Sequence, residues 1–192
     1  MKITQLIGLC GSLRQQSSNS AVLQTLSAEL LPPNVRLEVC DLKDIPLYNA
    51  DLDGDDPPAA VRELRTAVKN ATGLVIASPE YSQCMSGVIK NALDWLSSLD
   101  RPSPLRGKPT LTITASATFA GGGRAQHQLG EALWAVRATV INFPPVLITE
   151  VSSKIRNGRL VDEVARATLS EATEVLIEAS TQFSYDSELI WA

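Results

Sequence analysis

Residues that carry out covalent or metal chemistry are scarce in this sequence. Its three cysteines, Cys10, Cys40 and Cys84, form no C-x-x-C pair, which argues against disulfides and a zinc site. We predict reduced, buried thiols, as in a cytoplasmic protein. The one histidine, His127, falls inside a predicted helix with no nucleophile placed for it, which favours a structural role. A G-x-S-x-G elbow is also missing, and this argues against an esterase.

Strong charge and long apolar segments are missing too. The formal net charge is −4 and the isoelectric point is about 5.1, which argues against nucleic acid as a partner. No apolar run approaches the length of a membrane span, so we expect no membrane insertion. The first strand is predicted from Ile3, so we expect no signal peptide and a cytoplasmic location. With 192 residues, 44% of them hydrophobic, we predict a single domain over residues 1–192.

Acidic residues gather in one segment, 51–56, but they do not form a calcium loop. With Asp51 as the first ligand, Gly54 is misplaced, and the twelfth position holds Arg62 where a glutamate is needed. We therefore predict a solvated loop at this point and no metal site.

The loop that follows the first predicted strand, residues 3–9, is rich in hydrogen-bond donors. It lacks the complete G-x-G-x-x-G of dinucleotide folds, and the chain has no Gly-Lys-Ser/Thr ending of a P-loop. It precedes a predicted helix over residues 21–31, whose unpaired N–H groups would face a ligand beyond the strand. The hydroxyl, amide and guanidinium groups of this loop belong to Ser12, Arg14, Ser17, Ser18 and Asn19.

This set of donors predicts a site for a terminal phosphomonoester. Such a group carries nearly two negative charges and three acceptor oxygens at neutral pH, and no acidic residue lies between Lys2 and Leu26 to oppose it. The alternative is an ordinary strand–helix turn in which Ser18 or Asn19 only caps the helix.

Strands and helices alternate along the rest of the sequence. Further strands are predicted at residues 35–41, 73–78, 110–116 and 146–149, and helices at 57–71, 86–99, 124–138 and 161–183. This alternation predicts an α/β fold, doubly wound in three layers around a five-stranded parallel sheet of order 2-1-3-4-5. Ligands of such sheets bind beyond the C-terminal strand ends, which would bring together the loops 11–19, 79–82 and 116–123.

Three ordered motifs carry a resemblance to a known family. They are Gly11-Ser12-Leu13-Arg14-x-x-Ser17-x-Asn19, Ser78-Pro79-Glu80-Tyr81 and Gly87-x-x-Lys90-Asn91-x-x-Asp94-Trp95. Together they resemble the NADPH-dependent FMN reductase family, and within it the bacterial quinone and chromate reductases. The resemblance extends from the first strand to about Pro144.

The resemblance implies a flavodoxin-like fold with bound FMN and with NADPH or NADH as co-substrate. It also implies a homodimer or homotetramer and two-electron reduction of quinones or similar small acceptors, such as chromate, azo compounds or free flavin. Hydride transfer would be carried out by the bound FMN, so no catalytic side chain is predicted.

Site residues are carried over by position. Ser12, Arg14, Ser17 and Asn19 resemble the FMN phosphate contacts, and we include Ser18 of the same loop. Pro79, Glu80, Tyr81 and Ser82 resemble the loop along the isoalloxazine ring, and Ser116 matches a contact in the third loop. Two departures stand at Thr118, where relatives often have glycine, and at Gly130, where they often have arginine.

Single side chains near these loops have alternative interpretations. Tyr81 either lies beside the flavin ring or packs within its loop. Glu80 is predicted to maintain the geometry of the loop, and Cys84 to be a buried thiol. Trp95 and Leu96 are assigned to a subunit interface in preference to the core. Arg124, directly after three glycines, could contact a phosphate of the nicotinamide nucleotide.

Two further classes of function compete with the reductase. One is a flavodoxin-like electron carrier that serves protein partners without its own NAD(P)H turnover, although such carriers usually have a strongly acidic face. The other is a flavin or phosphate sensor, which binds its ligand without turnover.

Overall fold

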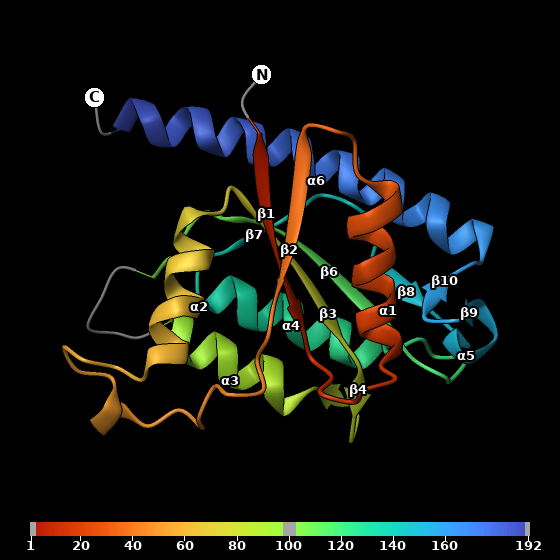
Figure 1. Cartoon of the computed structure of the whole chain (residues 1–192), viewed down its shortest axis with the longest axis horizontal. Helices are drawn as coiled ribbons and strands as arrows, with labels where there is room; N and C mark the ends of the chain where they lie inside the picture. Colours follow the sequence, from red (N-terminus) through yellow and green to blue (C-terminus); the bar gives the residue numbers. More distant parts are fainter. Residues whose placement is uncertain (1–2, 98–102, 191–192) are drawn as a thin grey trace.

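The sheet is parallel and follows the predicted strand order. The computed structural model describes residues 3–97 and 103–190, with the backbone alone for residues 184–190. Neighbouring strands run in the order β2-β1-β3-β6-β7, and β8 also pairs with β6. These strands are β1 (Thr4–Cys10), β2 (Val35–Cys40), β3 (Gly73–Ser78), β6 (Pro109–Ala115), β7 (Thr139–Val140) and β8 (Val146–Ile148). In Figure 1, β1 is the red arrow between β2 and β3.

Helices cover both faces of this sheet (Figure 1). They are α1 (Ser18–Thr25), α2 (Ala59–Asn70), α3 (Gly87–Leu96), α4 (Gly123–Ala135), α5 (Val151–Lys154) and α6 (Glu163–Ile190). Because successive strand residues point to opposite faces, two cores form. In β3, Val75 and Ala77 join the core under α1 and α6, whereas Leu74 and Ile76 join the core under α2, α3 and α4. The predicted doubly wound, three-layer α/β fold is confirmed.

Two short strands share the fifth position of the sheet. β7 pairs with the beginning of β6, and β8 pairs with its end. Between them lie Pro144 and Pro145, which have no N–H group to donate to a strand ladder. The strand predicted at residues 146–149 is therefore present, and β7 is an addition to the prediction.

Several short elements were not predicted. They are the 3-10 turn η2 (Ala50–Leu52), the one-turn helix α5, the hairpin of β4 (Glu80–Tyr81) and β5 (Cys84–Met85), and the hairpin of β9 (Ile155–Arg156) and β10 (Arg159–Leu160). The helix predicted over residues 21–31 is present as α1 followed by the π-helical turn η1 (Leu26–Leu30). The last predicted helix begins at Glu163 rather than at residue 161. The helix predicted to reach residue 99 ends at Leu96, and residues 98 and 99 lie outside the described residues. Within the described ranges, no helix has the length and hydropathy needed to cross a membrane.

The hairpin of β9 and β10 is attached to η1, which continues α1, by an ion-pair network. Glu29 accepts hydrogen bonds from Arg159 at 2.6 and 2.8 Å and from Arg166 at 2.9 Å. The bonds from Arg159 and Arg166 lower the pKa of the Glu29 carboxyl to about 2. The carboxylate therefore stays ionised in the folded protein well below neutral pH, and the hairpin remains held beside the first helix.

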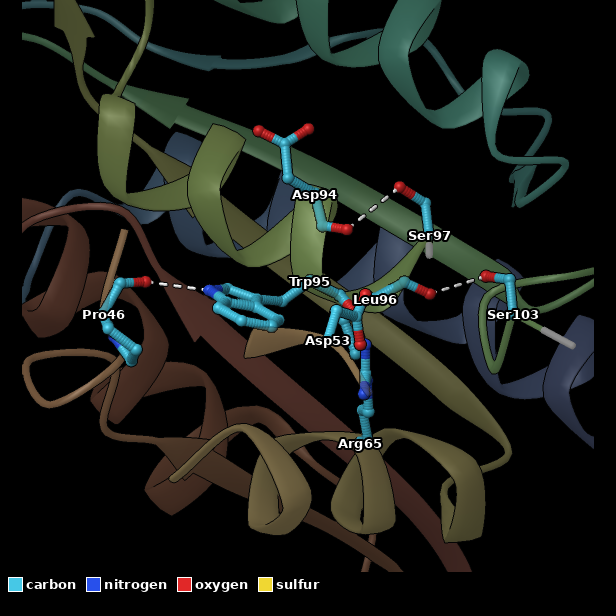
Figure 2. Close-up of polar contacts among 8 residues, drawn as sticks. All are labelled: Pro46, Asp53, Arg65, Asp94, Trp95, Leu96, Ser97 and Ser103. Carbon is cyan, nitrogen blue, oxygen red and sulfur yellow. Dashed lines mark hydrogen bonds and ion pairs between the residues drawn. The ribbon is translucent and has the colours of Figure 1, made fainter. Parts of the chain in front are cut away.

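Side chains from distant segments fix the C-terminal end of α3 (Figure 2). Arg65 of α2 donates from Nε and Nη2 to the Trp95 carbonyl, at 3.0 and 2.7 Å, and Nη2 also pairs with Asp53 at 2.7 Å. The Trp95 indole is 0% exposed, and its Nε1 donates to the Pro46 carbonyl at 2.8 Å. The interface assignment of Trp95 and Leu96 is wrong, because the loop before α2 covers the indole and Leu96 is buried in the core under α2, α3 and α4. The predicted solvated loop is also wrong at Asp53, whose carboxylate is buried against Arg65.

A buried lysine contacts the C-terminal end of α2. Lys108, immediately before β6, is buried, and its Nζ donates to the carbonyl of Ala71 just after the helix. The same Nζ lies 5.2 Å from the centroid of the Phe183 ring. Burial lowers the pKa of Lys108 to about 8. At α2 and α3 alike, a basic side chain from another segment meets the negative end of a helix dipole.

Candidate functional site

The three predicted loops meet at the C-terminal ends of β1, β3 and β6. The Gly11 N–H donates to the Ala77 carbonyl at 2.8 Å, which joins the first loop to β3. A Cβ atom on Gly11 would come within 2.5 Å of Ser86 Oγ, so the first loop packs closely on the segment that starts α3. Asn19 Nδ2 donates to the Ala115 carbonyl at 3.1 Å, which joins the first helix to β6. The contacts place the three loops around one edge of the sheet.

The first loop leads directly into the N-terminus of α1. Ser17 is the N-cap residue, and its Oγ accepts the Ser20 N–H at 3.1 Å. The helix therefore has a side-chain cap, as that alternative expects, but the cap is Ser17 rather than Ser18 or Asn19. Arg14 is exposed, Ser12 and Ser18 are half-buried, and the first turn of α1 contains no acidic residue. The loop therefore keeps donors and a positive charge available after the helix is capped.

Asn19 has a buried acceptor without a partner. The side chain is 3% exposed, and with Nδ2 bound to Ala115 its Oδ1 has no hydrogen-bond partner. Buried polar atoms are rarely left unsatisfied in native proteins. A phosphate dianion could not satisfy this atom, because both are acceptors, whereas a hydroxyl of a polyol chain could. The atom fits a ligand that continues from a phosphate into a hydroxylated chain.

A pocket of about 540 Å³ lies beside this loop. Its walls come from the first loop, the outer side of α1 and the tip of the β9–β10 hairpin, where Asn157 and Gly158 both have positive φ. No Asp or Glu side chain lines it. The Asn-Gly pair is a common signal for a tight hairpin, so this wall could have been found from the sequence.

The second loop is the hairpin of β4 and β5. Pro79 is buried, Glu80 is half-buried, and Tyr81 is 48% exposed. The turn residues Ser82 and Gln83 have φ values of 50° and 64°, which is unusual outside glycine. Cys84 is exposed in the hairpin, so the prediction that it is a buried thiol is wrong.

The third loop connects β6 to α4. The hydroxyl groups of Ser116 and Thr118 lie 3.0 Å apart in a mutual hydrogen bond, and Ser116 Oγ also accepts the Thr118 N–H at 3.2 Å. Thr118 is thereby held against the predicted contact residue, through a hydroxyl that the glycine expected at this position would lack. Gly122 has a φ of 85°, and a Cβ atom there would lie 2.9 Å from Thr114 Cβ. Only glycine fits this backbone without strain.

The second and third loops are joined by one carboxylate. Glu80 Oε2 accepts the N–H groups of Arg124 and Ala125, each at 3.0 Å. The Arg124 guanidinium donates to Gln83 Oε1, and Gln128 Oε1 accepts the Met85 N–H at 2.9 Å. These contacts hold the hairpin on the first turns of α4. This role of Gln83 and Gln128 was not predicted from the sequence, because neither residue belongs to a recognisable motif.

A largely apolar groove of about 760 Å³ runs along α4. It is lined by residues of α4, by β7 and by the segment leading into β8, and it includes Gly130. Trp134 on its rim is 82% exposed. The groove lies between α4 and the β7–β8 edge of the sheet rather than at the loops beyond the strand ends, so it is separate from the three-loop site.

Known proteins are similar to this chain in sequence and in fold. The profile of the NADPH-dependent FMN reductase family matches residues 4–153. An NAD(P)H-dependent FMN reductase of Pseudomonas aeruginosa is 38% identical over 175 residues, which cover 90% of this chain and 92% of the relative. A quinone reductase of Escherichia coli is 37% identical over 163 residues, covering 83% and 86%. The solved structure of FerB, a flavoenzyme NAD(P)H:(acceptor) oxidoreductase from Paracoccus denitrificans, superposes with a TM-score of 0.84 at 25% identity, covering 94% and 99%.

Proposed function

Because the chain belongs to the NADPH-dependent FMN reductase family, it is an NAD(P)H-dependent oxidoreductase with FMN as cofactor, and we propose that quinones are its electron acceptors. The observation that supports this best is the meeting of three loops at one sheet edge, with donors for a phosphate on the first. Bound FMN supplies the capacity to take up a hydride and release its electrons, which no side chain offers.

The first loop would hold the phosphate end of FMN. Arg14 provides a positive charge, and Ser12, Ser17 and Ser18 provide hydroxyls beside the free N–H groups of α1. Asn19 would direct its unsatisfied Oδ1 to a ribityl hydroxyl instead of to the phosphate itself. The residues present fit the cofactor at this end, because donors outnumber acceptors and the loop carries no competing carboxylate.

The second and third loops would flank the isoalloxazine ring. Main-chain groups of Pro79, Glu80, Tyr81 and Ser82 line one side and Ser116 lines another. The exposed ring of Tyr81 gives an apolar surface next to the flavin edge. A planar quinone suits such an open, partly aromatic site, because hydride transfer needs stacking and close approach rather than an acid or base. Chromate, azo compounds and free flavin are further candidate acceptors.

The groove along α4 supports a homodimer or homotetramer. A largely exposed tryptophan beside an apolar groove is typical of a surface that another chain covers. Gly130, where relatives often have arginine, lies in this groove, so an assembly here would lack that arginine's contact. The cytoplasmic location expected from the free cysteines stays a prediction.

Spectra and turnover test the proposed function. Purified protein with added FMN should give a bound-flavin spectrum, and it should oxidise NADPH or NADH in proportion to added quinone. Rates with both nicotinamides against quinone, chromate, azo dye and free FMN would rank the acceptors. Flavin binding without NAD(P)H oxidation would favour the electron carrier or the sensor instead. Failure to bind FMN at all would overturn the proposal.

The Arg14→Ala variant tests the phosphate end directly. Loss of a charged hydrogen bond should weaken FMN binding by about 1.5–3 kcal/mol, with little change in the thermal stability of the apoprotein because Arg14 is exposed. Titration of apoprotein with FMN, followed by quenching of flavin fluorescence, measures the effect. Equal affinity in parent and variant would remove Arg14 from the site.

A further inference from the structure

We infer that the Glu80 side chain is a positioning residue for the flavin site, which caps α4 from the neighbouring loop and so fixes the distance between the second and third loops. The inference rests on the proposed placement of the isoalloxazine ring between these loops. It assigns the side chain a role separate from any contact that the Glu80 main chain makes with the cofactor.

Helix α4 has no N-terminal residue that can cap it. Its N-cap residue is Gly122, which has no side chain to offer. A capping serine or aspartate is excluded there, because φ is 85° and a Cβ atom would lie 2.9 Å from Thr114 Cβ. The close approach of the third loop to β6 therefore removes the usual means of satisfying the first N–H groups of the helix.

The Glu80 side chain replaces the missing N-cap of α4. An N-cap side chain accepts the N–H of the second or third helical residue. In α4 these residues are Arg124 and Ala125, and both donate to Glu80 Oε2 at 3.0 Å. The negative charge also lies at the positive end of the helix dipole, where it is stabilising. Glu80, 44 positions before Arg124 in the sequence, thus performs the function that Gly122 cannot.

The β4–β5 hairpin is in turn stabilised by α4. Ser82 and Gln83 both occupy the left-handed region, which costs free energy for residues other than glycine. Gln83 accepts from the Arg124 guanidinium, and Met85 N–H donates to Gln128 Oε1 at 2.9 Å. Three points of contact therefore stabilise a turn that would otherwise relax. Without Glu80, the two walls of the ring site would be joined only by the contacts of Gln83 and Gln128.

Paired titrations with FMN and riboflavin test this role, because riboflavin lacks the phosphate. The Glu80→Ala variant should bind both flavins about tenfold more weakly, by the same factor, since the damage lies at the ring end. The Arg14→Ala variant should lose affinity for FMN and leave riboflavin binding unchanged. The Glu80→Gln variant should retain most of the affinity, because its amide oxygen can accept the same two bonds. The visible spectrum of the bound flavin should change in Glu80→Ala and not in Arg14→Ala.

Two further variants complete the experiment. Glu171→Ala removes an exposed carboxylate from α6 and should bind both flavins like the parent. Gln128→Ala breaks only the Met85 contact and should show a smaller loss for both flavins, which keeps the test open if Glu80→Ala does not fold. Parent-like affinity in Glu80→Ala, or in Gln128→Ala if Glu80→Ala does not fold, would overturn the inference, as would a loss confined to FMN. A parent that binds no FMN would instead overturn the proposed function.

Discussion

The N-termini of α1 and α4 lie at the same edge of the sheet, but their first N–H groups are capped in opposite ways. α1 has its own N-cap, Ser17, and no acidic residue in its first turn. α4 has no cap of its own, and the carboxylate of Glu80 occupies its first N–H groups. One helix end is therefore left without a negative charge, whereas the other already holds one.

This difference explains why a phosphate would select α1. A helix N-terminus attracts anions through its N–H groups and its dipole, and both attractions are already used at α4. The C-terminal ends of α2 and α3 follow the pattern of α4, since Lys108 and Arg65 supply the opposite charge from other segments. The C-terminal ends of α2 and α3 and the N-terminus of α4 are closed by distant side chains, and the end proposed to bind the cofactor is not.

The largest effect, on the free energy of unfolding, should come from placing a side chain at Gly122, where the third loop lies against β6. Gly122→Val places a β-branched side chain at a φ of 85° and against Thr114. Strain and overpacking together should lower the free energy of unfolding by about 3–5 kcal/mol. Urea unfolding followed by circular dichroism measures the loss.

Gly123→Val is the matched control for this change. A Cβ atom on Gly123 would have no neighbour within 4 Å, and the backbone there does not adopt the left-handed conformation, so the replacement should cost less. Equal destabilisation by the two variants would show that the left-handed conformation of Gly122 is not the cause.

A smaller effect should follow from giving α1 the arrangement of α4. Ser18→Asp adds a carboxylate to the first turn of α1, where it is favourable for the helix but repels a phosphate. Apoprotein stability should be unchanged or slightly higher, while FMN affinity falls by about 1.5–3 kcal/mol. Riboflavin binding serves as the control, because it should not change. Undiminished FMN binding would separate the phosphate from the end of α1.

The smallest effect is a pH dependence of the unfolding free energy, which arises from Lys108 at the C-terminal end of α2. The pKa of Lys108 is about 8 in the folded protein, below that of an exposed lysine. Between about pH 8 and 10.5 the folded state has lost this proton while the unfolded state keeps it, so stability rises with pH. The contribution should be about 1–2 kcal/mol.

The Lys108→Met variant isolates this contribution. The difference in unfolding free energy between parent and variant should grow in favour of the parent as pH rises from 8 to 10. Burial raises the pKa of the Cys40 thiol to about 11, which acts in the opposite direction but cancels in the difference. A constant difference over this range would contradict the shifted pKa.

Sequence patterns predicted the main strands, their order and the loops that meet, because periodicity and strand–helix alternation are local signals. They could not predict β7 or the β4–β5 hairpin, since strands of two residues have no detectable period. Trp95 was misassigned because its cover comes from the loop around Pro46, and Asp53 because one buried partner, Arg65, outweighs the polar character of its neighbours. The pairing of Glu80 with α4 joins residues with no pattern between them. Contacts that depend on tertiary packing leave no local trace.

The interrupted edge of the sheet also bears on how the protein behaves when it is concentrated or refolded. Exposed strand edges invite aggregation, because another chain can add its own strand to them. Here one edge is reduced to the two residues of β7 and the three of β8, with Pro144 and Pro145 between them, and the opposite edge, β2, carries exposed Arg36 and Glu38. Neither edge is a good template for amyloid-like growth, so we expect unwanted association to respond to changes on the helical faces and hardly at all to changes in the strands.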